Sequence, residues 1–573
     1  MTVKADSQKV DGTEYTYTLA LGGGGNTSYR AVKVPVTGTD TIKVVLRSSG
    51  SSERTLVVAD ASGNKLGTMT AGKSASLESY SYSGEEGYVY LYSSGSGINL
   101  YKIQVDSKGT GSSDSGSSDS GNTGSDSGNT GSDSGNTGSD SGSSDSGNTG
   151  SSDSTPVSGD IYVSPSGKSS NSGSESSPMD LVTAISKVKA GNTIWMQSGT
   201  YKISKTILID ESNSGKSGAY KKISNINGGK VVIDFDGMSE ASSNRGFVLD
   251  GDYWYFYGVE ICNAGDNGML LSGNNNVIEM CQFYNNHDTG LQLSRYNTSA
   301  NSISQWPAYN TILNCTSYNN KDEATAENAD GFAAKLTCGE GNVFDGCIAY
   351  CNSDDGWDLY AKPETGSIGV VTIKNCVAFG NGKLTDGSGS ANGDMNGFKL
   401  GGSNGQCPTP HVVENCVAFN NGACGFTDNG NGGALTMKNC TAANNGVYAS
   451  KANFMCYRTS SSAKYTNLLS YADSVKSSDK FLGKMSNTVY ANSGFYHISS
   501  GSFSGSAVKE GTKLSLSSSD FVSTSIPGYS GGKYATNYHT VFRNSDGSVN
   551  LDGLFEVKSN GTLGNYGVGA TLD

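Results

Sequence analysis

Two short stretches of the sequence place carboxylates around the same kind of Gly–aromatic pair. ENADGFAAKL contains Asp330 directly before its glycine, and NSDDGWDLYA contains Asp354, Asp355 and Asp358 around its glycine. A third stretch of the same form, DMNGFKLGG, has Lys399 at the position that Asp358 holds in the second. Carboxylate oxygens are the ligands that hard cations prefer, and a lysine of suitable pKa can serve as a base.

These stretches belong to a repeated strand of the form Gly–apolar–x–apolar. Because side chains alternate across a strand, the residue after each glycine should face a core and the next should face solvent. If each copy is one coil of a stack, the outward column reads Leu270, Gln292, Ala333, Asp358, Lys399 and Thr427. The residues before the glycines form a second column, which reads Asn267, Thr289, Asp330, Asp355, Asn396 and Cys424.

This alignment gathers four carboxylates on one outer patch. Asp330 and Asp355 should lie on adjacent coils about 4.8 Å apart, with Asp354 and Asp358 beside Asp355. Such a cluster repels itself unless a cation is present. Calcium–oxygen bonds of about 2.3–2.6 Å would let one ion between two coils reach both. We therefore predict a Ca²⁺ site at these four residues rather than a Mg²⁺ site, since nothing indicates a compact octahedral cage.

Lys399 should lie one coil beyond Asp358, about 4.8 Å away by the same spacing. A surface lysine beside acids most often forms a plain salt bridge. Beside a bound cation, however, like-charge repulsion lowers the pKa of a lysine, while free carboxylates raise it. The pattern predicts that Lys399 acts as a base.

A second repeat shows how such a stack is built. Segments such as NVIEMCQFYNN and HVVENCVAFNN recur at irregular spacing, which is typical of a parallel β-helix with loops of variable length. The shared cysteine is Cys262, Cys281, Cys315, Cys347, Cys376, Cys416 and Cys440. Five positions later stand Asn267, Asn286, Asn320, Asn352, Asn381, Asn421 and Asn445. We expect an internal ladder of buried free thiols, because parallel stacking is poor disulfide geometry, and a structural ladder of stacked amides.

The composition along the chain indicates three regions. Residues 1–106 read as short alternating strands and predict a small β-sandwich. Residues 107–157 are periodic in Gly, Ser and Asp without apolar residues and predict a disordered linker. Residues 158–573 predict the β-helix, with a short amphipathic helix in MDLVTAISKV covering its first coil and a non-repeat extension from about 505. The predicted fold class is all-β.

Charge and hydropathy narrow the class of partner. The net charge of −13 leaves no basic footprint for nucleic acid, and no apolar run approaches the roughly 20 residues of a membrane span. MTVKADSQKV lacks the apolar segment of a signal peptide. We expect that an export signal was removed and replaced by Met1.

The motifs ENADGFAAKL, NSDDGWDLYAK and NGFKLGG resemble those of polysaccharide lyase family 9, the pectate lyases built on a right-handed parallel β-helix. The resemblance covers roughly residues 160–573 and is strongest between 325 and 402. It implies that Asp330, Asp354, Asp355 and Asp358 bind one calcium ion and that Lys399 is the Brønsted base, as the column alignment also predicts.

The resemblance further implies β-elimination on α-1,4-polygalacturonate or pectin, with a 4,5-unsaturated product, an alkaline optimum, and secretion, since the polymer cannot enter a cell. We expect a monomer. Candidate substrate-binding residues are Lys335, Lys362, Arg295, Gln292 and Tyr360, although plain solvated side chains are an equally good interpretation of the cations.

Two alternatives remain at this point. A polygalacturonase-type hydrolase on the same fold would need an acid–base carboxylate pair about 6.5–9.5 Å apart, and the Gly-His-Gly and Arg-Ile-Lys motifs of that family are absent here. A non-catalytic, calcium-stabilised binding β-helix would keep its ligand without turnover.

The amino-terminal region carries a separate candidate surface. It is loosely similar to small domains attached to bacterial pectin enzymes. Its tyrosines either stack on sugars, which makes the sandwich a carbohydrate-binding domain, or pack in the core. They are Tyr80, Tyr82, Tyr88, Tyr90, Tyr92 and Tyr101.

Overall fold

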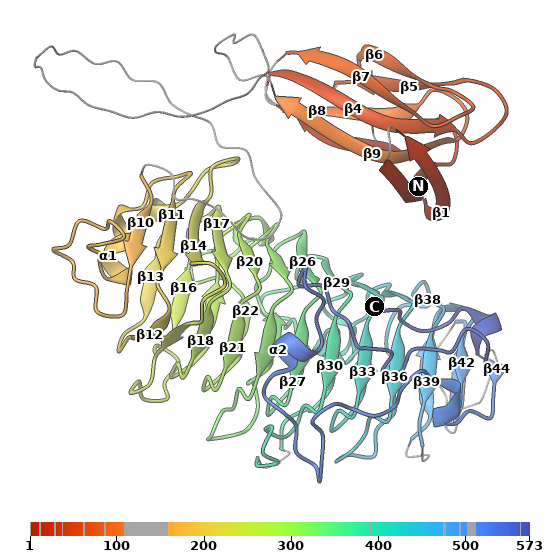
Figure 1. Cartoon of the computed structure of the whole chain (residues 1–573). Helices are drawn as coiled ribbons and strands as arrows, with labels where there is room; N and C mark the ends of the chain where they lie inside the picture. Colours follow the sequence, from red (N-terminus) through yellow and green to blue (C-terminus); the bar gives the residue numbers. More distant parts are fainter. Residues whose placement is uncertain are drawn as a thin grey trace, which may run out of the picture. The chain divides into compact units, whose positions relative to one another are not determined.

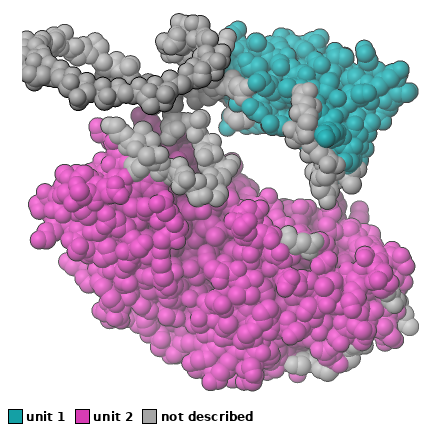
Figure 2. Space-filling view, in the orientation of Figure 1, with its two compact units in different colours: residues 1–138 teal, residues 139–573 magenta. Residues whose placement is uncertain are grey.

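The computed structural model separates the chain into two compact units, residues 1–138 and 139–573 (Figure 2). The described residues are 2–10, 13–27, 30–36, 38–60, 63–84, 87–107, 159–389, 392–473, 477–491, 494–500, 512–561 and 563–572. Apart from Ser107, the predicted linker lies outside these residues.

The first unit consists of two antiparallel sheets around a small core. The five-stranded sheet has the order β1 (Thr2–Val10), β2 (Thr13–Leu21), β9 (Ile98–Ser107), β4 (Thr39–Ser48) and β7 (Ser76–Ser83). The four-stranded sheet has the order β3 (Ala31–Val36), β8 (Gly87–Ser93), β5 (Arg54–Ala59) and β6 (Lys65–Ala71). Alternating apolar residues of both sheets meet between them, as the strand pattern predicts.

The second unit is a parallel β-helix of three long sheets, in which each full coil adds one strand to each sheet (Figure 1). The first sheet contains β10 (Ile161–Val163), β11 (Thr193–Met196), β14 (Lys221–Asn225), β17 (Trp254–Tyr257), β20 (Val277–Glu279), β23 (Thr311–Leu313), β26 (Asn342–Asp345), β29 (Val371–Lys374), β32 (Val412–Glu414), β35 (Thr436–Lys438), β38 (Lys464–Thr466) and β41 (Lys484–Ser486).

The second sheet contains β12 (Gly199–Lys202), β15 (Val231–Asp234), β18 (Glu260–Cys262), β21 (Gln282–Tyr284), β24 (Thr316–Tyr318), β27 (Ile348–Tyr350), β30 (Val377–Phe379), β33 (Val417–Phe419), β36 (Thr441–Ala443), β39 (Leu469–Tyr471), β42 (Val489–Tyr490) and β44 (Thr512–Lys513).

The third sheet contains β13 (Ile207–Ile209), β16 (Phe247–Leu249), β19 (Met269–Leu271), β22 (Leu291–Leu293), β25 (Phe332–Ala334), β28 (Trp357–Asp358), β31 (Phe398–Lys399), β34 (Phe426–Thr427), β37 (Phe454–Cys456), β40 (Asp479–Leu482) and β43 (Phe495–Ile498). The predicted all-β class and stacked coils are confirmed.

An asparagine ladder fixes the turn between the second and third sheets. The Asn286 side-chain amide donates to the Asn320 Oδ1 atom at 2.9 Å, and Asn320 donates to Asn352 in the same way at 2.8 Å. The pattern continues through Asn381, Asn421, Asn445 and Asn453. Each Oδ1 atom also accepts a backbone N–H of the preceding coil, so these buried polar groups are satisfied. The ladder is structural, as predicted.

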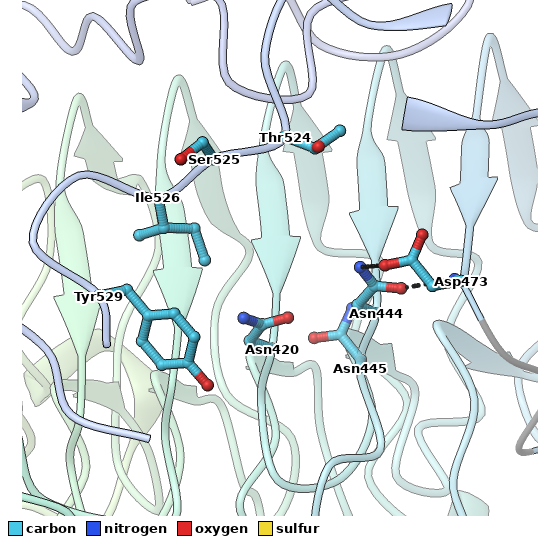
Figure 3. Close-up of a pocket in the computed structure, with 8 residues that line it drawn as sticks. All are labelled: Asn420, Asn444, Asn445, Asp473, Thr524, Ser525, Ile526 and Tyr529. Atoms are coloured by element: carbon cyan, nitrogen blue, oxygen red, sulfur yellow. Dashed lines mark hydrogen bonds between the residues drawn. The ribbon is translucent and has the colours of Figure 1, made fainter. Parts of the chain in front are cut away.

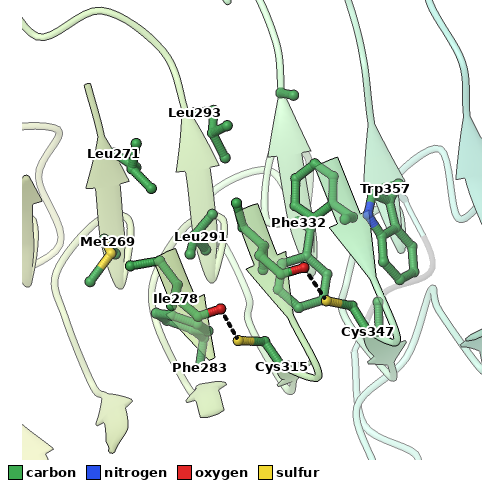
Figure 4. Packing of buried hydrophobic residues seen from close by; sticks show 14 of the residues in the cluster. Met269, Leu271, Ile278, Phe283, Leu291, Leu293, Cys315, Phe332, Cys347 and Trp357 are labelled. Atoms are coloured by element: carbon green, nitrogen blue, oxygen red, sulfur yellow. Dashed lines mark hydrogen bonds between the residues drawn. The ribbon is translucent and has the colours of Figure 1, made fainter. Parts of the chain in front are cut away.

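The thiol ladder is also present, with one correction to its register. All twelve cysteines are buried and unpaired, and those of the repeat pack in the core, where the Cys315 thiol donates to the Ile278 carbonyl at 3.3 Å (Figure 4). Cys262, however, pairs with Tyr284 rather than with Cys281. The alignment of the first copy was wrong by three residues: Val259 occupies the cysteine column and Ala264, not Asn267, precedes the asparagine ladder.

The ends and one side of the β-helix are covered. Helix α1 (Leu181–Lys187) begins after Asp180, whose side chain accepts the Thr183 N–H, and it buries its apolar face on the first coil. The segment from 512 to 572, which includes α2 (Tyr538–Val541), runs back along the second sheet and packs on its outer aromatic residues (Figure 1). No helix among the described residues has the length and apolar character of a membrane span.

Candidate functional site

The third sheet places the predicted carboxylate and lysine columns as the alternation requires. Asp358 and Lys399 are direct partners in the β28–β31 pair, and Ala333 precedes them in the same column. Their neighbours Trp357 and Phe398 stack in the core with ring centroids 4.7 Å apart. The side chains of Asp358 and Lys399 therefore point out of the coil.

The outward strip is nevertheless covered. Asp358 is 4 % exposed and Lys399 is 7 % exposed, so the expectation that this column faces open solvent is wrong. The cover includes the loop before β31, where Asp394 donates its backbone N–H to Asp354 Oδ1 at 2.5 Å and places its carboxylate 2.8 Å from Lys399 Nζ. A loop of irregular length folded over the strip cannot be read from the repeat.

Three of the four predicted ligands converge. Asp330, Asp354 and Asp355 each offer an oxygen, and these oxygens lie within 4.8 Å of one another. Asp358 is directed instead toward two lysines, with its Oδ2 atom 3.6 Å from Lys335 Nζ and 3.5 Å from Lys399 Nζ. The acidic cluster thus consists of three convergent carboxylates with a fourth at its edge.

Neighbouring backbone groups hold the cluster in shape. Asp354 Oδ2 accepts the Asn328 N–H at 2.9 Å, and Asp355 Oδ1 accepts the Asn396 N–H at 2.6 Å and its side-chain amide at 2.9 Å. Asp355 Oδ2 is buried and accepts no hydrogen bond from the described residues; its charge partner is Lys399 Nζ at 3.1 Å. Buried oxygens that lack a donor beside two further carboxylates fit a divalent cation coordinated by oxygen.

Burial and mutual repulsion shift the protonation equilibria of this cluster. Burial raises the pKa of Asp330 well above its ordinary value, against the opposing effect of Lys335. Burial raises the pKa of Asp355 in the same way, against Lys399, and also raises that of Asp354. Without a cation the cluster therefore favours added protons, which a bound cation would replace.

The two lysines respond in the opposite sense. Burial by itself lowers the pKa of Lys399, but Asp355, Asp358, Asp354 and Asp394 together raise it above its ordinary value. Lys335 behaves likewise, with Asp330 as the main charge that opposes burial. Its Nζ atom lies 2.6 Å from Asp330 Oδ2. Lys335 is thus a buried member of the cluster, and Asp394 is a member that sequence reasoning missed.

The remaining predicted substrate-binding residues lie along or beside the same strip. Gln292 is half-buried and shares the column of Asp358 two coils earlier. Arg295 donates to the Ala300 carbonyl at 2.6 Å and to Asn301 at 2.8 Å, so its guanidinium braces its own loop. Tyr360 and Lys362 follow β28, both half-buried. The Tyr360 N–H donates to Asp358 Oδ1 at 2.9 Å.

A cavity of about 430 Å³ lies elsewhere, between the turns after the second sheet and the segment from 524 to 529 (Figure 3). Its lining consists of Asn420, Asn444, Asn445, Asp473, Thr524, Ser525, Ile526 and Tyr529. Asn444 and Asp473 hydrogen-bond each other at 2.9 and 2.8 Å. None of the convergent carboxylates or lysines lines this cavity, so the chemistry belongs to the acidic cluster on the third sheet.

The fold and the acidic cluster define a parallel β-helix protein whose chemistry lies on one outer strip. Residues 161–467 match the family described as Pel9A-like, right handed beta helix region. The chain belongs to this family, which confirms the resemblance and the handedness inferred from the motifs.

Known relatives agree with that assignment. The chain is 48 % identical over 292 residues to pectate lyase L of Paenibacillus polymyxa (strain SC2), and the match covers 51 % of this chain and 64 % of the relative. It is 33 % identical over 423 residues to pectate lyase L of Dickeya chrysanthemi, covering 71 % and 85 %. The crystal structure of pectate lyase Pel9A superposes with a TM-score of 0.55 at 32 % identity, covering 70 % of this chain and 90 % of that chain. The chain thus spans just under two thirds of the length of the Paenibacillus relative.

Proposed function

We propose that the chain is a secreted, calcium-dependent pectate lyase that cleaves α-1,4-polygalacturonate by β-elimination and leaves 4,5-unsaturated oligogalacturonides. The observation that carries the proposal is the position of Lys399, whose amine lies 3.1 Å from Asp355 and 3.5 Å from Asp358 on the outer strip. The family and the names of its relatives support the same reaction. Secretion follows from the polymeric nature of the substrate, and we expect a monomer.

Asp330, Asp354 and Asp355 would hold the calcium ion, with Asp358 completing the site from its edge. When bound, calcium supplies positive charge at the uronate carboxylate and so makes the proton on the adjacent C5 atom more acidic. The chain itself keeps these carboxylates in place through Asn328 and Asn396, which leaves their free oxygens directed at one point.

Lys399 in its neutral form removes the C5 proton. The C5–H electron pair forms the C4–C5 double bond, the C4–O4 bond breaks, and the departing oxygen takes a proton from solvent. The new ammonium on Lys399 is then stabilised by Asp358 and Asp394. Because the Asp394 side chain is 59 % exposed, its carboxylate links the buried amine to water, where the proton can be released.

Lys335 has a different part in this proposal. Its ammonium is 2.6 Å from Asp330, so it offsets part of the negative charge of the cluster before substrate arrives. Substrate carboxylates would meet Lys362 and Gln292 farther along the strip. Tyr360 lies next to Asp358 and is placed to contact a sugar ring, while Arg295 would contribute mainly by holding its loop.

The test is an assay of the full chain on polygalacturonate with calcium and with a chelator. A lyase produces ultraviolet absorbance from the unsaturated product in parallel with new reducing ends, and the chelator abolishes both. New reducing ends without the absorbance would instead identify a hydrolase. Binding of the polymer without any product would identify the non-catalytic alternative.

A further inference from the structure

The amino-terminal sandwich divides its six candidate tyrosines among three environments. Tyr80 and Tyr82 on β7 pack against the core between the sheets. Tyr101 lies on the five-stranded sheet, where its hydroxyl donates to Asp6 at 2.7 Å and accepts from Arg47 at 2.6 Å. These three tyrosines are structural, which leaves the tyrosines of β8.

Strand β8 directs its three tyrosines away from the core (Figure 1). Val89 and Leu91 are fully buried between the sheets. By alternation Tyr88, Tyr90 and Tyr92 occupy the opposite, outer face of the four-stranded sheet. Tyr88 is 51 % exposed. The row from Tyr88 to Tyr92 extends over about 13 Å at the usual rise of a strand, which is longer than a single sugar ring.

Two lysines flank this row. Tyr90 is the direct cross-strand neighbour of Lys33 on β3 and of Ala59 on β5. Ala59 in turn pairs with Lys65 on β6. Both lysines are exposed, and Lys33 Nζ lies 3.8 Å from the centroid of the Tyr88 ring, a cation–π contact.

Charge separates this face from the rest of the chain. The described outward positions in the strands of the four-stranded sheet include Lys33 and Lys65 and no acidic side chain. Residues 1–107 contain ten Lys or Arg and ten Asp or Glu, whereas the whole chain has a net charge of −13. A polyanion therefore meets less repulsion at this face than elsewhere on the chain.

We infer that this tyrosine–lysine face (Lys33, Lys65, Tyr88, Tyr90 and Tyr92) binds an acidic polysaccharide. The apolar C–H faces of sugar rings pack on the tyrosine rings, as amphipathic aromatic side chains favour. The uronate carboxylates pair with the two lysine ammonium groups. Two lysines are too few for the basic footprint of a nucleic-acid site.

The choice of polygalacturonate as the probe rests on the proposed function, whereas the existence of a binding face does not. Because both units belong to one chain, binding at the sandwich would keep the β-helix near its polymer and raise the effective substrate concentration. This benefit should be absent for short soluble oligomers.

The binding test uses the full chain carrying Lys399→Ala, without calcium, so that turnover does not consume the polymer. Titration calorimetry measures its affinity for polygalacturonate. We expect Tyr90→Ala with Tyr92→Ala to weaken binding by about tenfold or more, because two stacking surfaces are lost. Tyr90→Phe with Tyr92→Phe should retain binding, since the rings remain. Lys33→Gln with Lys65→Gln should weaken binding and reduce its dependence on salt.

Matched controls lie on the other sheet of the same unit. Leu77→Ala removes an apolar side chain that is 43 % exposed on β7, and Lys102→Gln removes an exposed charge on β9; both should bind normally. Unchanged affinity of the tyrosine-to-alanine variant, with unchanged thermal unfolding, would overturn the inference. Equal binding of a neutral galactan, with no effect of the lysine changes, would overturn the assignment to acidic polymers.

The result is separable from the proposed function. With Lys399 intact, the tyrosine variants should cleave short oligogalacturonates at the rate of the unmodified chain and lose rate only on the long polymer. A chain that binds polygalacturonate through this face but produces no unsaturated product would refute the lyase proposal and leave the binding face standing.

Discussion

Lys399 and Asp358 lie in direct register on consecutive coils, and their Nζ and Oδ2 atoms are 3.5 Å apart. Asp355 Oδ2 lies 3.1 Å from the same amine. The proposed base and the proposed cation ligands therefore belong to one electrostatic unit, in which a charge change on one side is felt on the other.

Replacement of Lys399 by alanine should separate catalysis from cation binding. Loss of the base should reduce the rate of unsaturated product formation by about 10²–10⁴-fold. Calcium affinity should be retained or increased, because the removed ammonium competes with the cation for the same carboxylates. Ultraviolet product assays and calcium titration calorimetry measure the two effects.

The matched control is Lys374→Ala, which removes a lysine that is 41 % exposed and pairs with Asp345 at 2.9 Å on the first sheet. It should leave both quantities unchanged. A Lys399→Ala variant that keeps turnover within a few-fold of the unmodified chain would show that another group removes the proton.

The pH dependence of turnover should follow the protonation of Lys399. The surrounding carboxylates, against the effect of burial, raise the pKa of this amine, so the reactive neutral form becomes populated only as the pH rises. The value of kcat/KM should therefore increase into the alkaline range. Asp394→Asn removes one negative charge 2.8 Å from the amine, which lowers the pKa of Lys399 and shifts the rising limb to lower pH.

A pH–rate profile of both chains checks this prediction. Asp345→Asn, a change at the Lys374 pair on the first sheet, is the control and should not shift the profile. A rate maximum in the acid range would argue for a carboxyl group as the reactive acid or base. A shift of the rising limb to higher pH in Asp394→Asn would contradict the sign of the electrostatic argument.

The columns of the site were predictable because they repeat. Stacked coils oblige like positions to lie above like, so the Gly–apolar–x–apolar spacing placed Ala333, Asp358 and Lys399 in one line, and the paired strands bear this out. The first thiol copy failed because Cys262 stands three residues beyond the position that Val259 fills, where another small apolar residue satisfies the core equally well.

What could not be predicted depends on the loops between the strands. Asp394 is five residues from Lys399 in the sequence, but only the folded loop before β31 brings its carboxylate back to the amine. The same covering loops bury Asp358, and Lys335 finds its partner Asp330 through a turn rather than along the column. Loop paths have no period, so the sequence pattern carries no signal for them.

The carboxyl-terminal segment should stabilise the β-helix chiefly through Tyr538. This side chain is fully buried, and its ring meets Tyr350 and Phe379 edge to face at centroid distances of 5.1 and 5.0 Å. Tyr538→Ala should lower the free energy of unfolding by about 3–5 kcal/mol, as other large-to-small aromatic changes do. Tyr538→Phe loses only the hydrogen bond to the Pro527 carbonyl and should cost about 1 kcal/mol.

Urea unfolding and limited proteolysis measure these changes. Tyr529→Ala, in the same segment but 41 % exposed, is the control and should have little effect. If Tyr538→Ala unfolds like the unmodified chain, the segment is not a stabilising part of the second sheet.

Acid should destabilise the folded chain through His411. This side chain is 1 % exposed, and its Nδ1 atom accepts the Val371 N–H at 3.1 Å, as Asn342 accepts that of Asn310 at 3.0 Å. Burial lowers the pKa of His411 to about 3, whereas an unfolded histidine has a pKa of about 6.5. Above pH 6.5 both states are neutral and the residue contributes no pH dependence.

Below that pH the unfolded chain takes up a proton that the folded chain does not. The free energy of unfolding should therefore fall by about 1.4 kcal/mol per pH unit from pH 6.5 toward pH 3 on account of this group. His411→Asn keeps the acceptor for Val371 and removes the titration. Between pH 6.5 and 5 the variant should lose about 2 kcal/mol less than the unmodified chain. Because both chains carry the same carboxylates and His539, the difference isolates His411. His287→Asn, at a half-exposed site, is the control, and equal acid sensitivity of the His411→Asn and unmodified chains would contradict the prediction.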